Sequence, residues 1–126
     1  MAEPWFIGLE VLLELHAESL RRYGGSEGIR DLGLIESALG AAQNTYFYGH
    51  GDLFDIAAAY AFHIAQAQAF LDGNKRTAAA AALVFLDENG ISESPSDIEL
   101  YDAMIAIAEK RLTKTQLAQL FRERCG

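Results

Sequence analysis

Residues 52–87 read DLFDIAAAYAFHIAQAQAFLDGNKRTAAAAALVFLD, two alanine-rich apolar segments with one charged cluster between them. The segments Asp52 to Ala69 and Thr77 to Asp87 are apolar on nearly all sides, which is the pattern of helices that neighbouring elements bury. Because alanine has no side chain beyond Cβ, these helices allow neighbouring backbones to approach closely. The stretch therefore predicts two central helices joined by a charged turn.

Apolar periodicity predicts two helices before this stretch. The first runs from about Gly8 to Arg22 and ends at Gly24-Gly25, and the second runs from about Asp31 to Ala41. Their expected buried faces comprise Leu9, Leu12, Leu13, His16, Leu20 and Tyr23 in the first helix, and Leu34, Ile35, Ala38 and Leu39 in the second.

Capping signals predict two helices after it. Ser96 with Glu99, and Thr113 with Gln116, are capping boxes that satisfy free N–H groups at a helix start, and Asn89-Gly90 stops the helix before them. The expected inward residues are Ile98, Tyr101, Ile105 and Ala108, then Leu117, Leu120 and Phe121. Six helices with no confident strand predict an all-α compact bundle, formed as a single domain by residues 1–126.

The charged cluster has a composition suited to binding a phosphate group. The helix that follows it points free N–H groups and the positive end of its dipole into the turn. Gly73 lets an anion approach the backbone, and Asn74 adds an amide donor. Lys75 and Arg76 supply positive charge, and Asp72 is a ligand for magnesium that enters with the phosphates. A solvated turn whose charges serve only solubility is the alternative.

The stretch from Phe70 to Arg76 resembles the motif His-x-Phe-x-Asp-Gly-Asn-Lys-Arg of the Fic/Doc superfamily, in its death-on-curing (Doc) branch of small bacterial and phage toxins. Further landmarks of that branch follow in the expected order over nearly the whole chain: Arg22-Tyr23-Gly24-Gly25, Gly28-Ile29-Arg30-Asp31, Leu34-Ile35-Glu36-Ser37-Ala38-Leu39, Asp52-Leu53-Phe54, Phe85-Leu86 and Asn89-Gly90.

The resemblance implies a toxin of a toxin–antitoxin pair that stops translation by transferring a phosphoryl group from ATP to a hydroxyl of elongation factor Tu. In that role Asp72 would hold magnesium, while Gly73 and Asn74 would orient the phosphates. Lys75 and Arg76 would neutralise developing charge. The wider superfamily transfers AMP, and Lys75, where AMP-transferring members usually have glycine, favours phosphoryl transfer. The resemblance also implies an antitoxin whose disordered tail folds into a groove on the bundle.

Gln68 stands where the motif has its histidine, which is the general base in the family. A glutamine amide can hydrogen-bond but cannot accept a proton near neutral pH. A general base typically contributes about 10²- to 10⁴-fold in rate, so positioning and phosphate binding can leave residual transfer. Two other functions therefore stay open, a catalytically silent module that binds nucleotide and antitoxin, and a helical adaptor without nucleotide.

Residues Asn44 to Gly51, NTYFYGHG, form an aromatic, glycine-punctuated segment for which propensity alone allows a short hairpin. The resemblance implies a flap here, beside the active site, that positions the target segment. A lid of aromatic side chains over the core is the alternative.

Three histidines and one phenylalanine complete the candidates. His16 lies on the apolar face of the first helix, either as a core histidine or at the edge of the active site. His63 is expected to hydrogen-bond in the core, too far round the helix axis to replace Gln68. His50 is expected to be exposed, and no histidine spacing suits zinc. Phe70 is the expected anchor of the turn in the core.

Ten Lys and Arg against 18 Asp and Glu give a net charge of −8. With no basic run, direct binding of nucleic acid is not expected, and the local Lys75-Arg76 pair favours one small anionic ligand. No basic region and apolar run follow Met1, and acids interrupt every apolar stretch, so neither a signal peptide nor a membrane span is expected and a cytoplasmic location is favoured. The single Cys125 excludes an internal disulfide.

Overall fold

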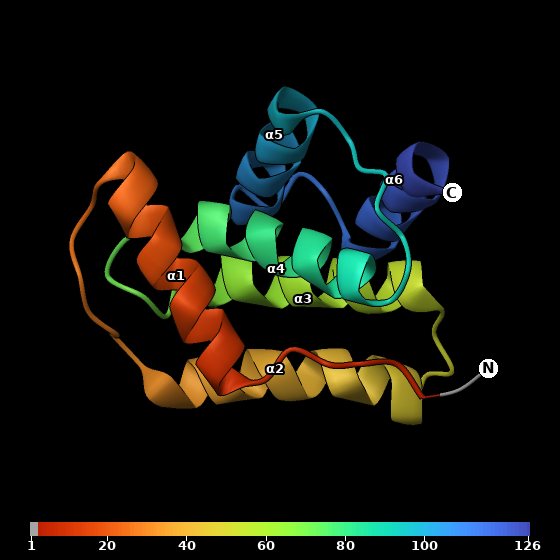
Figure 1. Ribbon diagram of the computed structural model, residues 1–126, viewed down its shortest axis with the longest axis horizontal. Coiled ribbons are helices and arrows are strands. Elements are labelled where there is room, and N and C mark those ends of the chain that lie inside the picture. Colours follow the sequence, from red (N-terminus) through yellow and green to blue (C-terminus); the bar gives the residue numbers. More distant parts are fainter. Residues whose placement is uncertain (1–2) are drawn as a thin grey trace.

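The computed structural model describes residues 3–126, which fold into an all-α bundle, as the sequence predicts (Figure 1). No strand occurs in these residues, and an isolated bridge pairs Ile29 with Phe70. The expectation about the start of the chain falls partly on Met1 and Ala2, which lie outside the described residues. The helices are α1 (Leu9–Tyr23), α2 (Leu32–Phe47), α3 (Leu53–Ala67), α4 (Asn74–Glu88), α5 (Asp97–Ala108) and α6 (Lys114–Cys125).

Helix α3 is the centre of the bundle and packs against α2, α4, α5 and α6, while α1 packs across α4 and α2 (Figure 1). Its alanines at positions 57, 58, 59 and 61 have no exposed surface, which confirms that this helix is buried by its neighbours. No helix within residues 3–126 is long and apolar enough to span a membrane.

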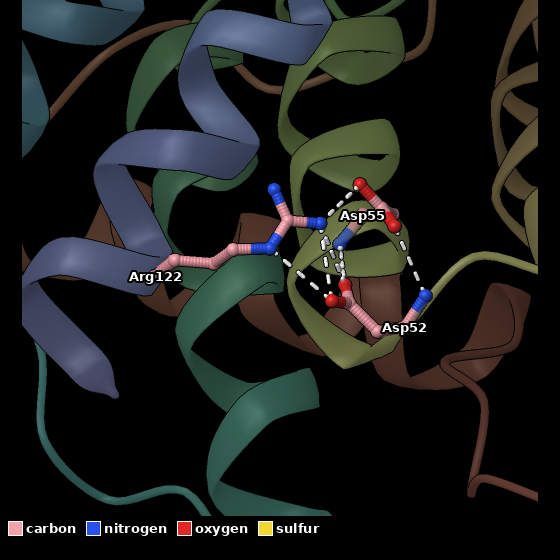
Figure 2. A network of polar contacts seen from close by, with 3 residues as sticks. All are labelled: Asp52, Asp55 and Arg122. Atoms are coloured by element: carbon pink, nitrogen blue, oxygen red, sulfur yellow. Dashed lines mark hydrogen bonds and ion pairs between the residues drawn. The ribbon is translucent and has the colours of Figure 1, made fainter.

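A polar network fastens α6 to the first turn of α3 (Figure 2). Asp52 and Asp55 form a capping box, in which each carboxylate accepts the other residue's backbone N–H. Arg122 of α6 donates to both carboxylates, at 3.1 Å to Asp52 and 2.7 Å to Asp55. Burial alone would raise the pKa of Asp52, but the hydrogen bonds from Asp55 and Arg122 outweigh it and hold that pKa below its usual value.

The structure corrects the prediction for the segment Asn44 to Gly51. Helix α2 continues to Phe47, because Tyr46 and Phe47 pack their rings on Phe6 and this contact overrides their preference for strands. The segment therefore precedes α3, whereas the charged turn follows it. The 15 residues of α3 separate the two by about 22 Å, so the segment is not a flap beside that turn.

The two central helices have different ends from those predicted. Helix α3 stops at Ala67, and Gln68 adopts the left-handed conformation with φ 48° and ψ 44°. Because Gln68 lies outside the helix, its position relative to His63 is not given by rotation about the helix axis. Helix α4 begins at Asn74, three residues before Thr77, so most of the charged cluster forms its first turn.

Some residues that the sequence predicts to face inward are exposed. Leu34 is 42% exposed and Ile98 is 77% exposed. Tyr23 and Tyr101 are also exposed, and α5 packs on the bundle through a neighbouring face. That face of α5 consists of Leu100, Ala103, Met104 and Ile107.

The two predicted capping boxes have different outcomes. The box of Thr113 and Gln116 is complete. Ser96 caps the N–H of Glu99, but the Glu99 carboxylate pairs with Arg124 of α6, so the second half of that box is missing.

Candidate functional site

The turn between α3 and α4 is held from within by one side chain. The Asn74 side-chain oxygen accepts the backbone N–H of Phe70 at 3.1 Å, and its amide nitrogen donates to the Phe70 carbonyl at 3.0 Å. The Phe70 ring is 1% exposed, which confirms it as the anchor of the turn. Since the Asn74 amide is occupied by backbone, its first role in this structure is to shape the turn.

The segment between α1 and α2 supports the turn from outside. The Arg30 N–H donates to the Ala69 carbonyl at 2.6 Å, and the Leu71 N–H donates to the Gly28 carbonyl at 3.1 Å. Gly28 is required here, because its φ is +126° and a Cβ would lie 2.8 Å from Leu71 Cδ1. In Figure 1 these two connections lie together at the left-hand end of the bundle.

His16 of α1 buttresses the same turn from below. Its Nε2 lies 2.9 Å from the Asp72 carbonyl oxygen, so Nε2 carries the proton and donates it, since a carbonyl can only accept. Its ring stacks on Phe70 at 3.8 Å between centroids. The histidine is buried, as the core interpretation of the sequence predicts, and it reaches the turn through its bond to the Asp72 carbonyl.

The Asp72 carboxylate is fixed by backbone donors. The Ser26 N–H donates to Oδ2 at 3.2 Å and the Gly73 N–H donates to Oδ1 at 2.9 Å. These two bonds, with smaller contributions from the charges of Arg76 and His16, hold the pKa of Asp72 below its usual value. The carboxylate is therefore ionised at neutral pH.

A pocket of about 220 Å³ opens over this turn. Its lining includes every residue that the sequence predicted for the site: Gln68, Asp72, Gly73, Asn74, Lys75 and Arg76. Four lining residues were not predicted for the site, Arg30, Ala65, Leu71 and Tyr101, and two of them, Arg30 and Tyr101, have polar side chains. Arg30 comes from the segment before α2 and Tyr101 from α5, and no spacing in the sequence relates either to the motif.

The first turn of α4 makes the pocket electropositive. Gly73 precedes the helix in the left-handed conformation, with φ +76°, and gives no side-chain cap. The N–H groups of the first turn have no acceptor within the helix, and they point into the same region as the positive end of the helix dipole. Gly73 and the cations Lys75 and Arg76 therefore combine backbone donors with full charges at one place.

Arg76 lies between the pocket and a second cavity. Its guanidinium stands 4.4 Å from the ring centroid of Tyr23 and 5.5 Å from that of Tyr101, which are cation–π distances. The second cavity is an apolar groove of about 490 Å³ between α1, α4 and α5. Arg76 and Tyr101 line both spaces, so the two are adjacent and share these side chains as a common wall.

None of the three histidines lines the pocket beside Gln68. His16 donates its Nε2 proton to the backbone carbonyl of Asp72. His63 is half-buried, and its Nε2 lies 3.3 Å from Nζ of Lys114 in α6. Burial lowers the pKa of His63, and the charge of Lys114 lowers it further. His50 is exposed at the opposite end of α3. The residues around Gln68 therefore include no histidine that can accept a proton from a hydroxyl in the pocket.

Comparisons with known proteins point in one direction. The sequence matches the Fic/DOC family over residues 6–86, a stretch that contains both connections of the site. It is 36% identical over 121 residues to the protein kinase Doc of Escherichia phage P1, covering 95% of each chain. It is also 44% identical over 72 residues to the toxin Doc of Mycolicibacterium smegmatis, covering 55% of each chain.

Proposed function

The chain belongs to the Fic/DOC family, and on that premise we propose that it is a Doc-like toxin of a toxin–antitoxin pair, acting in the cytoplasm. Its pocket would bind ATP with magnesium and direct phosphoryl transfer to a hydroxyl of elongation factor Tu, which would block translation. The observation that carries this proposal is the single pocket that gathers Gln68 with the whole cluster from Asp72 to Arg76.

The residues of the pocket fit a magnesium-bound triphosphate. Lys75, Arg76 and the first turn of α4 offer charges and N–H donors to phosphate oxygens. Each oxygen of Asp72 accepts one N–H, which leaves lone pairs free for a metal. Within residues 3–126 no three acidic, histidine or cysteine side chains form a metal site, which suits magnesium because it takes most of its ligands from phosphates and water. Bound magnesium would supply charge neutralisation at the phosphates.

The position of each pocket residue suits it to a different role in phosphoryl transfer. Asp72 would hold the metal at the mouth of the turn, and its low pKa keeps it charged for this. Lys75 and Arg76 would stabilise the charge that develops on the transferred group. Asn74 would act mainly through the turn, because its amide is bound to Phe70.

Gln68 sets the expected rate. It would meet the incoming hydroxyl as a hydrogen-bond partner without taking its proton, which would then have to pass to water or a phosphate oxygen, and this predicts slow transfer. The same residue favours a second candidate function, a catalytically silent module that binds nucleotide and antitoxin. Transfer of AMP is a third outcome, which the presence of Lys75 disfavours.

The antitoxin is proposed to occupy the groove between α1, α4 and α5. Leu15, Leu83 and Leu100 line it, and such a surface suits the apolar face of a tail that folds on binding. Because the groove shares Arg76 with the pocket, a tail bound there would lie against a phosphate-binding residue.

Growth of bacterial cells after induced expression tests the toxin proposal. We expect weak inhibition by the chain itself, strong inhibition by Gln68→His, and normal growth when Lys75→Ala is added to Gln68→His. Strong toxicity of the unmodified chain, lost with Lys75→Ala, would exclude the silent module. Normal growth with Gln68→His would contradict the toxin proposal.

A further inference from the structure

Most arginines of this acidic chain are held by carboxylates. The ten Lys and Arg residues include five arginines in ion pairs: Arg21, Arg22, Arg111, Arg122 and Arg124. The other five cations form no ion pair with a carboxylate among residues 3–126: Arg30, Lys75, Arg76, Lys110 and Lys114. Three of these five, Arg30, Lys75 and Arg76, line the same 220 Å³ pocket.

The backbone places Arg30 at the Gln68 side of this pocket. The Arg30 N–H bonds to the carbonyl of Ala69, the residue next to Gln68, at 2.6 Å. The neighbouring bridge between Ile29 and Phe70 fixes the same segment. The position of Arg30 therefore depends on the turn itself, although the two are about 40 residues apart in sequence. Its side chain is exposed and donates no hydrogen bond within residues 3–126.

We propose that Arg30 is a third phosphate-binding residue, which contacts the phosphate group nearest Gln68 from the wall opposite α4. This inference rests on the proposed nucleotide function and extends it to a residue outside the motif. Lys75 and Arg76 approach the ligand from the first turn of α4, whereas Arg30 approaches from the segment before α2. A planar guanidinium with no internal partner is suited to pair with two phosphate oxygens.

The negative net charge of the protein is the reason that an unpaired cation in this pocket points to an anionic ligand. At −8 the protein as a whole repels polyanions, so a phosphate ligand depends on local positive charge. Bound magnesium, Lys75, Arg76 and the helix dipole would all offset the charge of a triphosphate, but the Asp72 carboxylate adds a negative charge beside it, and Arg30 brings one further positive charge to the pocket. Arg30 also adds a donor beside Gln68, where the transferred group would lie.

Isothermal titration with magnesium-ATP, and separately with inorganic tripolyphosphate, tests this role in Arg30→Gln. Lys110→Gln is the matched control, because it removes the same charge from a residue that lines neither the pocket nor the groove. We expect Arg30→Gln to raise both Kd values about tenfold, the size of one charge-assisted hydrogen bond. We expect Lys110→Gln to change them less than about twofold, because solvent and salt screen a distant charge. Urea unfolding should be unchanged in Arg30→Gln, since its backbone bond to Ala69 remains.

The outcomes separate this inference from the function on which it rests. Equal affinities for Arg30→Gln and Lys110→Gln, with ATP bound tightly, would overturn the role of Arg30 and leave the nucleotide pocket standing. Weaker tripolyphosphate binding by Arg30→Gln, with no binding of ATP to the unmodified chain, would support the phosphate contact and contradict the nucleotide function. Binding of neither compound to the unmodified chain would overturn both.

Discussion

Replacing Asn74 by alanine tests whether one side chain holds the turn. The substitution removes hydrogen bonds of 3.1 and 3.0 Å to the N–H and C=O of Phe70. Each neutral bond contributes about 0.5–1.5 kcal/mol, and a buried group left unpaired costs about 1–3 kcal/mol. Because the turn is only partly buried, water can reach one of the freed groups, and alanine favours the helix slightly. We therefore expect a loss of about 2 kcal/mol in the free energy of unfolding.

Urea unfolding followed by circular dichroism measures this loss, with Asn74→Asp as the matched control. Aspartate keeps the acceptor for the Phe70 N–H, loses the donor to the Phe70 carbonyl, and adds a negative charge at the start of α4, where the dipole favours it. We expect it to lose about half as much stability as alanine. A loss below about 0.5 kcal/mol for Asn74→Ala would show that this amide does not hold the turn.

Four further substitutions test the packing and the charges. Phe70→Ala should lower the free energy of unfolding by about 3–4 kcal/mol, because it empties the core under the turn, whereas Lys75→Ala should leave urea unfolding unchanged; equal effects would contradict the division between anchor and ligand. Arg122→Ala should cost about 1 kcal/mol at low salt and less in 1 M salt, because its partners Asp52 and Asp55 are partly exposed; a cost independent of salt would point to packing instead. The pKa of His63 is lowered in the fold, so its contribution to stability is complete above its unfolded pKa of about 6.5 and is lost as pH falls through the folded value. His63→Gln should therefore flatten the decline in stability between about pH 7.5 and 5, and an unchanged pH profile would rule this out.

The helices that the sequence predicts well are those with redundant local signals. Alanine-rich runs marked α3 and α4, and Thr113 with Gln116 marked the start of α6. Local sequence patterns predicted the wrong structure where contacts between distant residues determine where a helix ends. The aromatic residues after Asn44 suggested a loop, but packing on Phe6 extends the helix to Phe47.

The candidate site divides in the same way. The contiguous motif from Asp72 to Arg76 was visible because its residues are neighbours in sequence. Arg30 and Tyr101 reach the pocket only through the bridge to Phe70 and the packing of α5, and neither contact leaves a local pattern. Such residues require either coordinates or knowledge of which segments pair.

Intact-mass analysis of elongation factor Tu decides whether this chain transfers a phosphoryl group to that target. The factor is incubated with ATP, magnesium and either the unmodified chain or Gln68→His. We expect a gain of one phosphate with Gln68→His and a gain slower by about 10²- to 10⁴-fold with Gln68. An AMP-sized gain would assign the chain to the AMP-transferring members of its family. No gain with either protein would contradict phosphoryl transfer to this target and favour the silent binding module.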